Sequence, residues 1–374
     1  MTMRQLIGEP VVEALRATIH AIPTDAPESD ATLDWDVTTM VLVEVVAAGH
    51  SGIGWTYGSP AVARVVTGRL TEAVLGRDAM DVPGANAAMA TALRNDGRPG
   101  MGAEAVSAVD IALWDLKARI LGVPLARLFG RVREDVPVYG SGGFTSYGDE
   151  RLARQLEGWV GEQGIPRVKI KIGEGWGGRE DRDLERTRLA REVVGEDTEL
   201  YVDANGGYSR KQAVRVSHAL EPYRVAWFEE PVSSDDLAGL REVRELVRPD
   251  VAAGEYGWDL PGLTRMASSG AVDCLQADAT RCGGLTVWLR AAAVAEGLGL
   301  ELSGHGAPHV HASVAAAVPN LRHLEWFHDH ARIEAMLFEG ALSPDGGVLR
   351  PGADGAPGLG LRLRPQTAEE YRTA

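Results

Sequence analysis

Three short apolar runs in this chain end in an acidic residue at intervals of 26 positions. The acidic residues are Asp203, Glu229 and Glu255, which follow the runs 200–202, 226–228 and 251–254. A stretch that can form a helix follows each run, so the repeating unit is strand, turn and helix. A parallel barrel built from such units presents the carboxyl ends of neighbouring strands at one mouth, where these carboxylates would converge. Hard divalent cations prefer oxygen ligands of this kind, so the pattern predicts a Mg²⁺ site.

The alternation of strand-like and helix-like segments begins at residue 136 and continues to about residue 338. The expected strands are 136–141, 167–172, 199–205, 226–231, 251–255, 274–278, 300–305 and 323–326. Eight such segments favour a closed α/β barrel over an open doubly wound sheet.

The segments before and after this alternating part have a different pattern. Residues 38–46 are rich in Val, Leu and Thr, which is typical of a strand, and helical patterns follow at about 61–75, 86–93 and 103–121. After residue 338 a segment rich in Gly and Pro offers no further barrel unit and is expected to fold back on the N-terminal part. We therefore expect an α+β domain in residues 1–125, a barrel in 126–338 and a C-terminal segment in 339–374.

The composition narrows the possible partners and compartments. The net charge is −15 and no block of Lys or Arg forms a basic stripe, which argues against nucleic-acid binding. No stretch approaches 18 consecutive apolar residues, so a membrane span is not expected. The two cysteines fall in one segment and the first residues lack the apolar region of a secretory signal. We expect a reduced, cytoplasmic protein.

Two lysines alternate with an isoleucine in the second expected strand. Because side chains two positions apart share a face, Lys169 and Lys171 can both point into the barrel. Proximity to a divalent cation and to each other would lower the pKa of both ammonium groups, which suits one of them as a general base. The alternative is a solvated lysine pair on an edge strand, because Lys is rarely buried without a partner.

The sixth and seventh strands end in Asp278 and His305. Neighbouring strands ending in Asp and His can form a hydrogen-bonded dyad in which the carboxylate orients the imidazole and raises its basicity. His309 and His311 are expected to be structural residues of a helix. The eighth strand carries Glu325, which could hydrogen-bond a developing oxyanion if it were protonated.

In a barrel, Lys171 and His305 would flank a substrate bound over the cation. Two bases on opposite faces of a carbon next to a carboxylate are what proton abstraction at that carbon requires, and the metal would stabilise the resulting enediolate.

The chain resembles the mandelate racemase subgroup of the enolase superfamily over nearly its whole length. The segments that carry the resemblance are 169–171, 202–205, 228–231, 254–255, Asp278 with 283–284, 303–305 and 324–326, together with the helix at 105–117. The resemblance implies a (β/α)7β-type modified TIM barrel. It also implies an α+β N-terminal capping domain that the C-terminal segment completes, and a homo-oligomer.

By this resemblance Asp203, Glu229 and Glu255 would bind Mg²⁺. Lys169 would hold an oxygen of the substrate carboxylate, and Lys171 would act as one of the two bases.

The resemblance also assigns the other side of the site. Asp278 and His305 would form the second acid/base unit, and Glu325 would face the enediolate. Asn205 would lie near the metal ligands and contact the substrate, whereas Glu230 matches a position beside a ligand.

Two segments of the N-terminal domain are expected to cover the barrel mouth as loops, at about 22–32 and 49–60. The first contains Thr24 among several polar residues, and the second contains Tyr57; both are candidate substrate contacts. A polar lid suits a hydroxylated sugar acid better than an aromatic acid, which would need an apolar pocket. The alternative is that these acidic residues only solvate a mobile loop.

The strand ends alone leave the reaction open. Return of a proton to the same carbon would give racemisation, whereas protonation of a departing β-hydroxyl by His305 would give a 2-keto acid. Our first hypothesis is a Mg²⁺-dependent dehydratase acting on a small carboxylate, an acid sugar. A racemase or epimerase of a 2-hydroxy acid is the second, and a non-catalytic barrel that binds carboxylates is a remote third.

Overall fold

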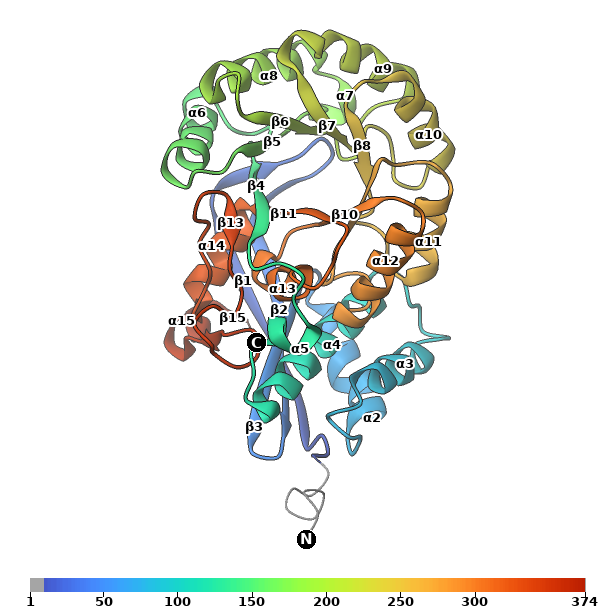
Figure 1. Ribbon diagram of the computed structural model, residues 1–374, viewed down its shortest axis with the longest axis vertical. Coiled ribbons are helices and arrows are strands. Elements are labelled where there is room, and N and C mark those ends of the chain that lie inside the picture. Colours follow the sequence, from blue (N-terminus) through green and yellow to red (C-terminus); the bar gives the residue numbers. More distant parts are fainter. Residues whose placement is uncertain (1–9, 374) are drawn as a thin grey trace.

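The computed structural model describes residues 10–373, which form an antiparallel sheet packed against a closed parallel barrel (Figure 1). The antiparallel sheet contains β1 (Ala14–Ser29), β2 (Asp34–Ala47) and β3 (His50–Tyr57) in sequential order. Its helical cover consists of α1 (Ala61–Val65), the π-helix η2 (Val66–Leu70), α2 (Thr71–Val74), α3 (Val82–Ala92) and α4 (Met101–Leu121). The helix expected at 61–75 is therefore interrupted by a π-helical turn.

Helix α4 lies directly on the sheet because β3 carries glycines where the two elements meet. A Cβ atom at Gly52 or at Gly54 would lie 2.3 Å from a backbone carbonyl oxygen of α4, so no larger residue fits at either position. The helix ends at Gly122, whose left-handed conformation (φ 68°) caps it.

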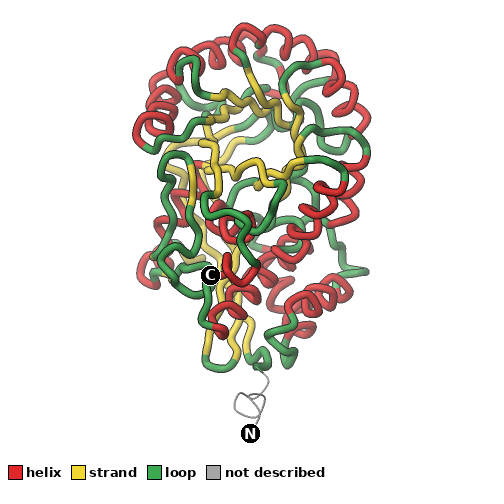
Figure 2. The backbone as a smooth tube through the Cα atoms, viewed as in Figure 1, coloured by secondary structure: helices red, strands yellow, loops and turns green. Residues whose placement is uncertain are grey.

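The barrel predicted from the strand-like segments is confirmed (Figure 2). Its strands are β4 (Val136–Gly142), β5 (Arg167–Lys171), β6 (Glu199–Asp203), β7 (Val225–Glu229), β8 (Asp250–Ala253), β9 (Cys274–Ala277), β10 (Glu301–Gly304) and β11 (Leu321–Phe327). All neighbours are parallel, and β11 pairs with β4 to close the ring.

Helices surround this ring, as Figure 1 shows for α6, α8, α9 and α10. The helices and helical turns are α5 (Leu125–Phe129), α6 (Asp149–Glu157), η3 (Gly158–Glu162), α7 (Glu174–Gly177), α8 (Glu180–Val194), α9 (Arg210–Ala219), η4 (Glu221–Tyr223), α10 (Leu237–Leu246), α11 (Leu260–Ser268), α12 (Leu285–Gly297), α13 (Pro308–Ala315) and α14 (His328–Leu337). Within residues 10–373, no helix combines the length and the apolar character needed to cross a membrane.

Large side chains fill the barrel below its carboxyl-terminal mouth. Tyr139, Tyr201 and Trp227 form a buried cluster, and the ring of His323 lies 4.6 Å from that of Tyr139. The ammonium group of Lys169 lies 5.2 Å from the Tyr139 ring centre. The interior is therefore packed from below up to Lys169, so polar chemistry is confined to the mouth.

The chain after α14 pairs with both domains, whereas the sequence predicted a return to the N-terminal part alone. Strand β13 (Val348–Leu349) pairs with β4, and β12 (Phe338–Glu339) pairs with β14 (Arg362–Leu363). After α15 (Pro365–Glu370), β15 (Arg372–Thr373) adds to the edge of the antiparallel sheet beside β1.

The two segments expected as lid loops are mostly strands. Strands β1 and β2 form a long hairpin that is paired from Ala14↔Val46 to Ser29↔Asp34, with an irregularity between Pro23 and Glu28. Most of the second segment belongs to β3. The alternation of exposed polar residues in these segments therefore reflects strand pairing rather than loops.

Buried hydrogen bonds hold the antiparallel sheet over the barrel mouth. Trp55 Nε1 and Tyr57 Oη donate to Oε1 of Glu334 at 3.1 and 3.0 Å. Thr56 Oγ1 donates to the carbonyl of Thr280 at 2.8 Å, just beyond β9. The sheet is thus fixed as a roof above the strand ends.

Candidate active site

The three acidic residues of the repeat converge at the barrel mouth. Asp203 and Glu229 are paired in register at the ends of β6 and β7, and an oxygen of each lies within 4.8 Å of an oxygen of Glu255. Glu255 follows β8 by two residues, and Gly254 makes that turn possible. Its φ is 139°, and a Cβ atom there would lie 2.0 Å from the carbonyl oxygen of Gln276.

The donor set fits a hard divalent cation. All three carboxylates are buried, and three oxygen ligands of this charge are typical of Mg²⁺. Burial and the neighbouring Asp203 raise the pKa of Glu229 to about 8, which indicates negative charge that the surrounding cations do not neutralise. The buried acidic groups here are Asp203, Glu229, Glu230, Glu255, Asp278 and Glu325.

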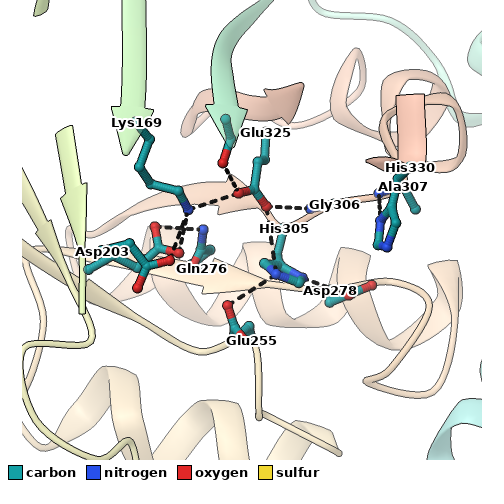
Figure 3. A network of polar contacts seen from close by, with 12 residues as sticks. Lys169, Asp203, Glu255, Gln276, Asp278, His305, Gly306, Ala307, Glu325 and His330 are labelled. Carbon is teal, nitrogen blue, oxygen red and sulfur yellow. Dashed lines mark hydrogen bonds and ion pairs between the residues drawn. The ribbon is translucent and has the colours of Figure 1, made fainter. Parts of the chain in front are cut away.

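Both lysines of β5 point into the barrel. Lys169 Nζ lies 2.5 Å from Glu229 Oε1 and 2.8 Å from Glu325 Oε1, and Lys171 Nζ lies 2.5 Å from Asp203 Oδ2. Figure 3 shows Lys169 extending between Asp203 and Glu325. The alternative of a solvated pair does not describe this strand, since both side chains are buried.

The expectation that a bound cation lowers the pKa of both lysines stays a prediction. With the protein groups alone, burial lowers the pKa of both ammonium groups, but the combined attraction of the surrounding carboxylates, led by Glu229 for Lys169 and by Asp203 for Lys171, outweighs burial. The pKa of each therefore lies above its ordinary value. Direct contact between each ammonium group and a carboxylate outweighs repulsion between the two lysines.

His305 and Asp278 form the predicted dyad across the mouth from the lysines. His305 Nδ1 lies 2.9 Å from Asp278 Oδ2, while the other oxygen of Asp278 accepts hydrogen bonds from the backbone and hydroxyl of Thr280. His305 Nε2 points toward Glu255 Oε2 at 3.0 Å. Burial lowers the pKa of His305, but Glu255 and Glu325 raise it to about 10.

Glu325 is held as a carboxylate rather than as the proton donor considered from the sequence. Its Oε1 accepts a hydrogen bond from Ser141 Oγ at 2.6 Å, and its Oε2 accepts one from Gly306 N at 2.8 Å. Burial raises the pKa of Glu325, but the combined attraction of Lys169, His305 and Lys171 outweighs burial and holds this pKa well below its usual range.

A cavity of about 400 Å³ opens above these strand ends. Among the sequence-predicted residues, Lys171, Asn205, Glu255, His305 and Tyr57 line it. Asn205 adopts a positive φ of 40° at the end of β6, and its backbone N–H donates to Asp203 Oδ1 at 2.9 Å.

Thr24 is not among the residues that line this cavity. It lies within β1, in the irregular part of the hairpin between Pro23 and Glu28. The hydroxyl of Tyr57 is directed to Glu334, so only the ring is available to a bound molecule.

His311 has a more specific role than that of an ordinary helix residue. Its Nε2 accepts a hydrogen bond from Ala279 N at 2.8 Å, and its Nδ1 donates to the carbonyl of Ala307 at 3.0 Å. It therefore braces the segments that follow Asp278 and His305. His309 contacts Glu334 and lies away from the cavity.

Sequence reasoning missed several residues of the site. Arg281 lines the cavity and lies 3.4 Å from Glu255 and 3.5 Å from Asp278; its position three residues after Asp278 was the available signal. His330 also lines the cavity but comes from α14, a helix to which the sequence assigned no chemistry.

Comparisons with known proteins agree with this architecture. The family model of the mandelate racemase / muconate lactonizing enzyme N-terminal domain matches residues 16–130, and the enolase C-terminal domain-like model matches residues 151–367. A structure of a mandelate racemase/muconate lactonizing enzyme-like protein from Rubrobacter xylanophilus superposes with a TM-score of 0.94. It is 52% identical and covers 97% of this chain and 100% of its own.

Two named enzymes are also similar. The L-talarate/galactarate dehydratase of Salmonella typhimurium is 30% identical over 88% of this chain and 86% of its own. Its structure liganded with Mg and L-lyxarohydroxamate has a TM-score of 0.89, at 27% identity, and covers 100% of this chain and 95% of that one. The 3,6-anhydro-alpha-L-galactonate cycloisomerase of Streptomyces coelicolor is 31% identical over 94% of this chain and 97% of its own.

Proposed function

Because this chain belongs to the mandelate racemase subgroup of the enolase superfamily, we propose that it dehydrates an acid sugar to a 2-keto-3-deoxy acid with the help of Mg²⁺. The observation that carries the proposal is the placement of two acid/base groups, Lys171 and the His305–Asp278 dyad, on different sides of one carboxylate cluster. A dehydratase and a cycloisomerase among the similar proteins are consistent with an enzyme of this superfamily.

Asp203, Glu229 and Glu255 are the residues that would hold the metal, since their buried oxygens lie within 4.8 Å of one another. When bound, Mg²⁺ supplies positive charge next to the substrate carboxylate and so stabilises the extra negative charge of an enediolate. Lys169 would donate hydrogen bonds to the same carboxylate, which places the substrate's α-carbon above the cluster.

The protein's own groups then move two protons. One of the pair Lys171 and His305 removes the proton from C2, and the electron pair of that C–H bond becomes the C1–C2 double bond of the enediolate. The elimination follows when the C3–O bond breaks with its electrons and the hydroxyl group leaves as water after protonation. His305 suits this donation because Asp278 Oδ2 lies 2.9 Å from its Nδ1 and can stabilise an imidazolium there. The resulting enol gains a proton at C3 and loses the proton of its C2 hydroxyl group, which gives the 2-keto-3-deoxy acid.

The roof of the cavity supports a hydroxylated substrate. Thr39 and Ser59 line it and offer hydroxyl groups that can exchange hydrogen bonds with a polyol, whereas the hydroxyl of Thr38 already donates to Asp329. An aromatic 2-hydroxy acid would leave these hydroxyl groups without partners.

The proposal is tested by incubating the enzyme with Mg²⁺ and a panel of acid sugars in deuterated water. Formation of a 2-keto acid with loss of a hydroxyl group supports it, and Lys171→Ala and His305→Asn are expected to lower the rate by at least 100-fold. Exposed residues provide matched controls, since Lys211→Ala and His50→Asn remove the same side-chain types and are expected to keep the parental rate.

Other outcomes identify other functions. Exchange of the α-proton for deuterium with inversion, and without a keto acid, would reject dehydration in favour of a racemase or epimerase. Binding of an acid sugar without any reaction, unchanged in Lys171→Ala, would indicate a carboxylate-binding barrel.

A further inference from the structure

The cavity has a floor and a roof of different charge. Its floor is formed by barrel strand ends and contains the cationic side chains Lys171 and Arg281. Its roof is formed by the β1–β2 hairpin, the start of α1 and the start of α14. Among residues 10–373, no Lys or Arg of the roof lines the cavity, whereas two carboxylates, those of Asp30 and Asp329, do.

The floor cations lie against carboxylates of the proposed catalytic cluster. Lys171 Nζ lies 2.5 Å from Asp203, and Arg281 lies 3.4 Å from Glu255 and 3.5 Å from Asp278. A substrate with one carboxylate can bind at the metal ligands on this floor. A second carboxylate at the far end of the substrate would meet no cation of the roof.

The two roof carboxylates differ in how their charge is compensated. Asp329 is buried and forms an ion pair with Arg332 at 2.6 Å. Asp30 accepts hydrogen bonds only from neutral groups, the backbone and hydroxyl of Thr32 and the backbone of Leu33. In the described part of the chain Asp30 forms no ion pair, and this residue lines the cavity.

His330 adds a neutral hydrogen-bond donor to the roof. Its Nδ1 accepts a hydrogen bond from Ala307 N at 3.0 Å, so the ring proton resides on Nε2 (Figure 3). The ring is fixed by stacking on Tyr57 at 3.6 Å and by an edge contact with Phe327 at 4.9 Å. Within residues 10–373, Nε2 has no hydrogen-bond partner, which leaves it available to an oxygen of the substrate.

From these contacts we propose that the substrate is a monocarboxylic sugar acid, an aldonate, rather than a dicarboxylic aldarate. This inference rests on the dehydration proposed above. The single carboxylate lies on the floor, and the hydroxylated tail lies against the roof. There a hydroxyl group donates to Asp30, and His330 Nε2 donates to a hydroxyl oxygen. The distal carboxylate of an aldarate would instead be repelled by Asp30.

The test compares five- and six-carbon aldonates with the aldarates of the same configuration, with kcat/KM measured for each pair. We expect kcat/KM of the best aldonate to exceed that of its aldarate by at least 100-fold.

Asp30→Asn keeps the turn, because Asn accepts the same backbone hydrogen bonds, and is expected to reduce this ratio at least tenfold by improving aldarate turnover. His330→Phe keeps the stacked ring and is expected to raise KM for the aldonate more than it lowers kcat. The matched control is Asp36→Asn on exposed β2, which should leave the ratio unchanged.

Failure of this inference is distinguishable from failure of the proposed function. An aldarate preferred by the parent enzyme, or a ratio unchanged in Asp30→Asn, overturns the inference while dehydration stands. Absence of turnover with every acid sugar overturns dehydration. In that case ligand-induced thermal shifts of the Lys171→Ala variant still decide between the two classes, because aldonate stabilisation without aldarate stabilisation supports the inference and the reverse refutes it.

Discussion

Glu28→Gln is expected to change how the stability of this protein depends on pH. Glu28 is 1% exposed, accepts one hydrogen bond from Trp35 Nε1 at 2.9 Å, and has no partner for its other oxygen within residues 10–373. Burial, together with repulsion from Asp329, raises its pKa from 4.5 to about 8.

The sign of the effect follows from proton binding in the two states. Between pH 4.5 and 8 the folded protein holds the Glu28 proton while the unfolded chain has released it, so stability falls as the pH rises through this range. The loss of unfolding free energy is complete above pH 8. It is at most about 5 kcal/mol, because each unit of difference between the folded and unfolded pKa of Glu28 contributes about 1.36 kcal/mol. Gln cannot ionise, and its carbonyl oxygen can still accept from Trp35.

The assay is urea unfolding at pH 5, 7 and 9, followed by tryptophan fluorescence. We expect the variant to match the parent at pH 5 within about 1 kcal/mol and to exceed it by at least 2 kcal/mol at pH 9. Glu72→Gln on exposed α2 is the control and should follow the parent at every pH. Parallel profiles for the Glu28→Gln variant and the parent would refute the assignment of a buried, proton-retaining carboxyl group.

Three further predictions concern the site and its roof. Asp278→Asn is expected to lower kcat by roughly 100-fold to 10,000-fold with little change in KM, because an amide cannot hold a protonated His305; a fall below tenfold would contradict this role. EDTA is expected to abolish turnover. Mg²⁺ at 100 times its Kd is expected to raise the free energy of unfolding of the parent protein by about 2.7 kcal/mol. Asp203→Asn should remove that stabilisation in a thermal melt, and an equal shift in both proteins would exclude Asp203 as a ligand. Glu334→Gln keeps one oxygen for the Trp55 and Tyr57 donors but turns an NH2 group toward the backbone N–H of His309, and it should cost about 2–4 kcal/mol in urea unfolding. Parental stability would show that this contact contributes little free energy.

Much of the fold was predictable because its signals are local. Each barrel strand is a short apolar run followed by a turn and a helical pattern, and these features depend on neighbouring residues. The convergence of Asp203, Glu229 and Glu255 then followed from parallel pairing, which brings the carboxyl ends of strands together. The pairing of Asp278 with His305 followed from the same rule.

The sequence predicted the two segments that cover the barrel mouth less accurately. Residues 22–32 are polar and contain prolines, which is typical of a loop, yet most of them extend β1 in its hairpin with β2. Pairing with a partner strand overrode this local pattern. Thr24 is not among the residues that line the cavity, whereas His330, which lines it, belongs to a helix without a recognisable motif.

The amino-acid sequence by itself determined which functional groups stand at the barrel mouth, because alternation along a strand and the order of strands decide which side chains point there. Only the tertiary structure decided the ionisation of those groups. Lys169 and Lys171 keep raised pKa values because carboxylates distant in the sequence touch them, and Glu28 keeps its proton because the roof buries it near Asp329. Burial and charge–charge distances are properties of the packed molecule, so the character of the cavity emerges only when the two domains meet.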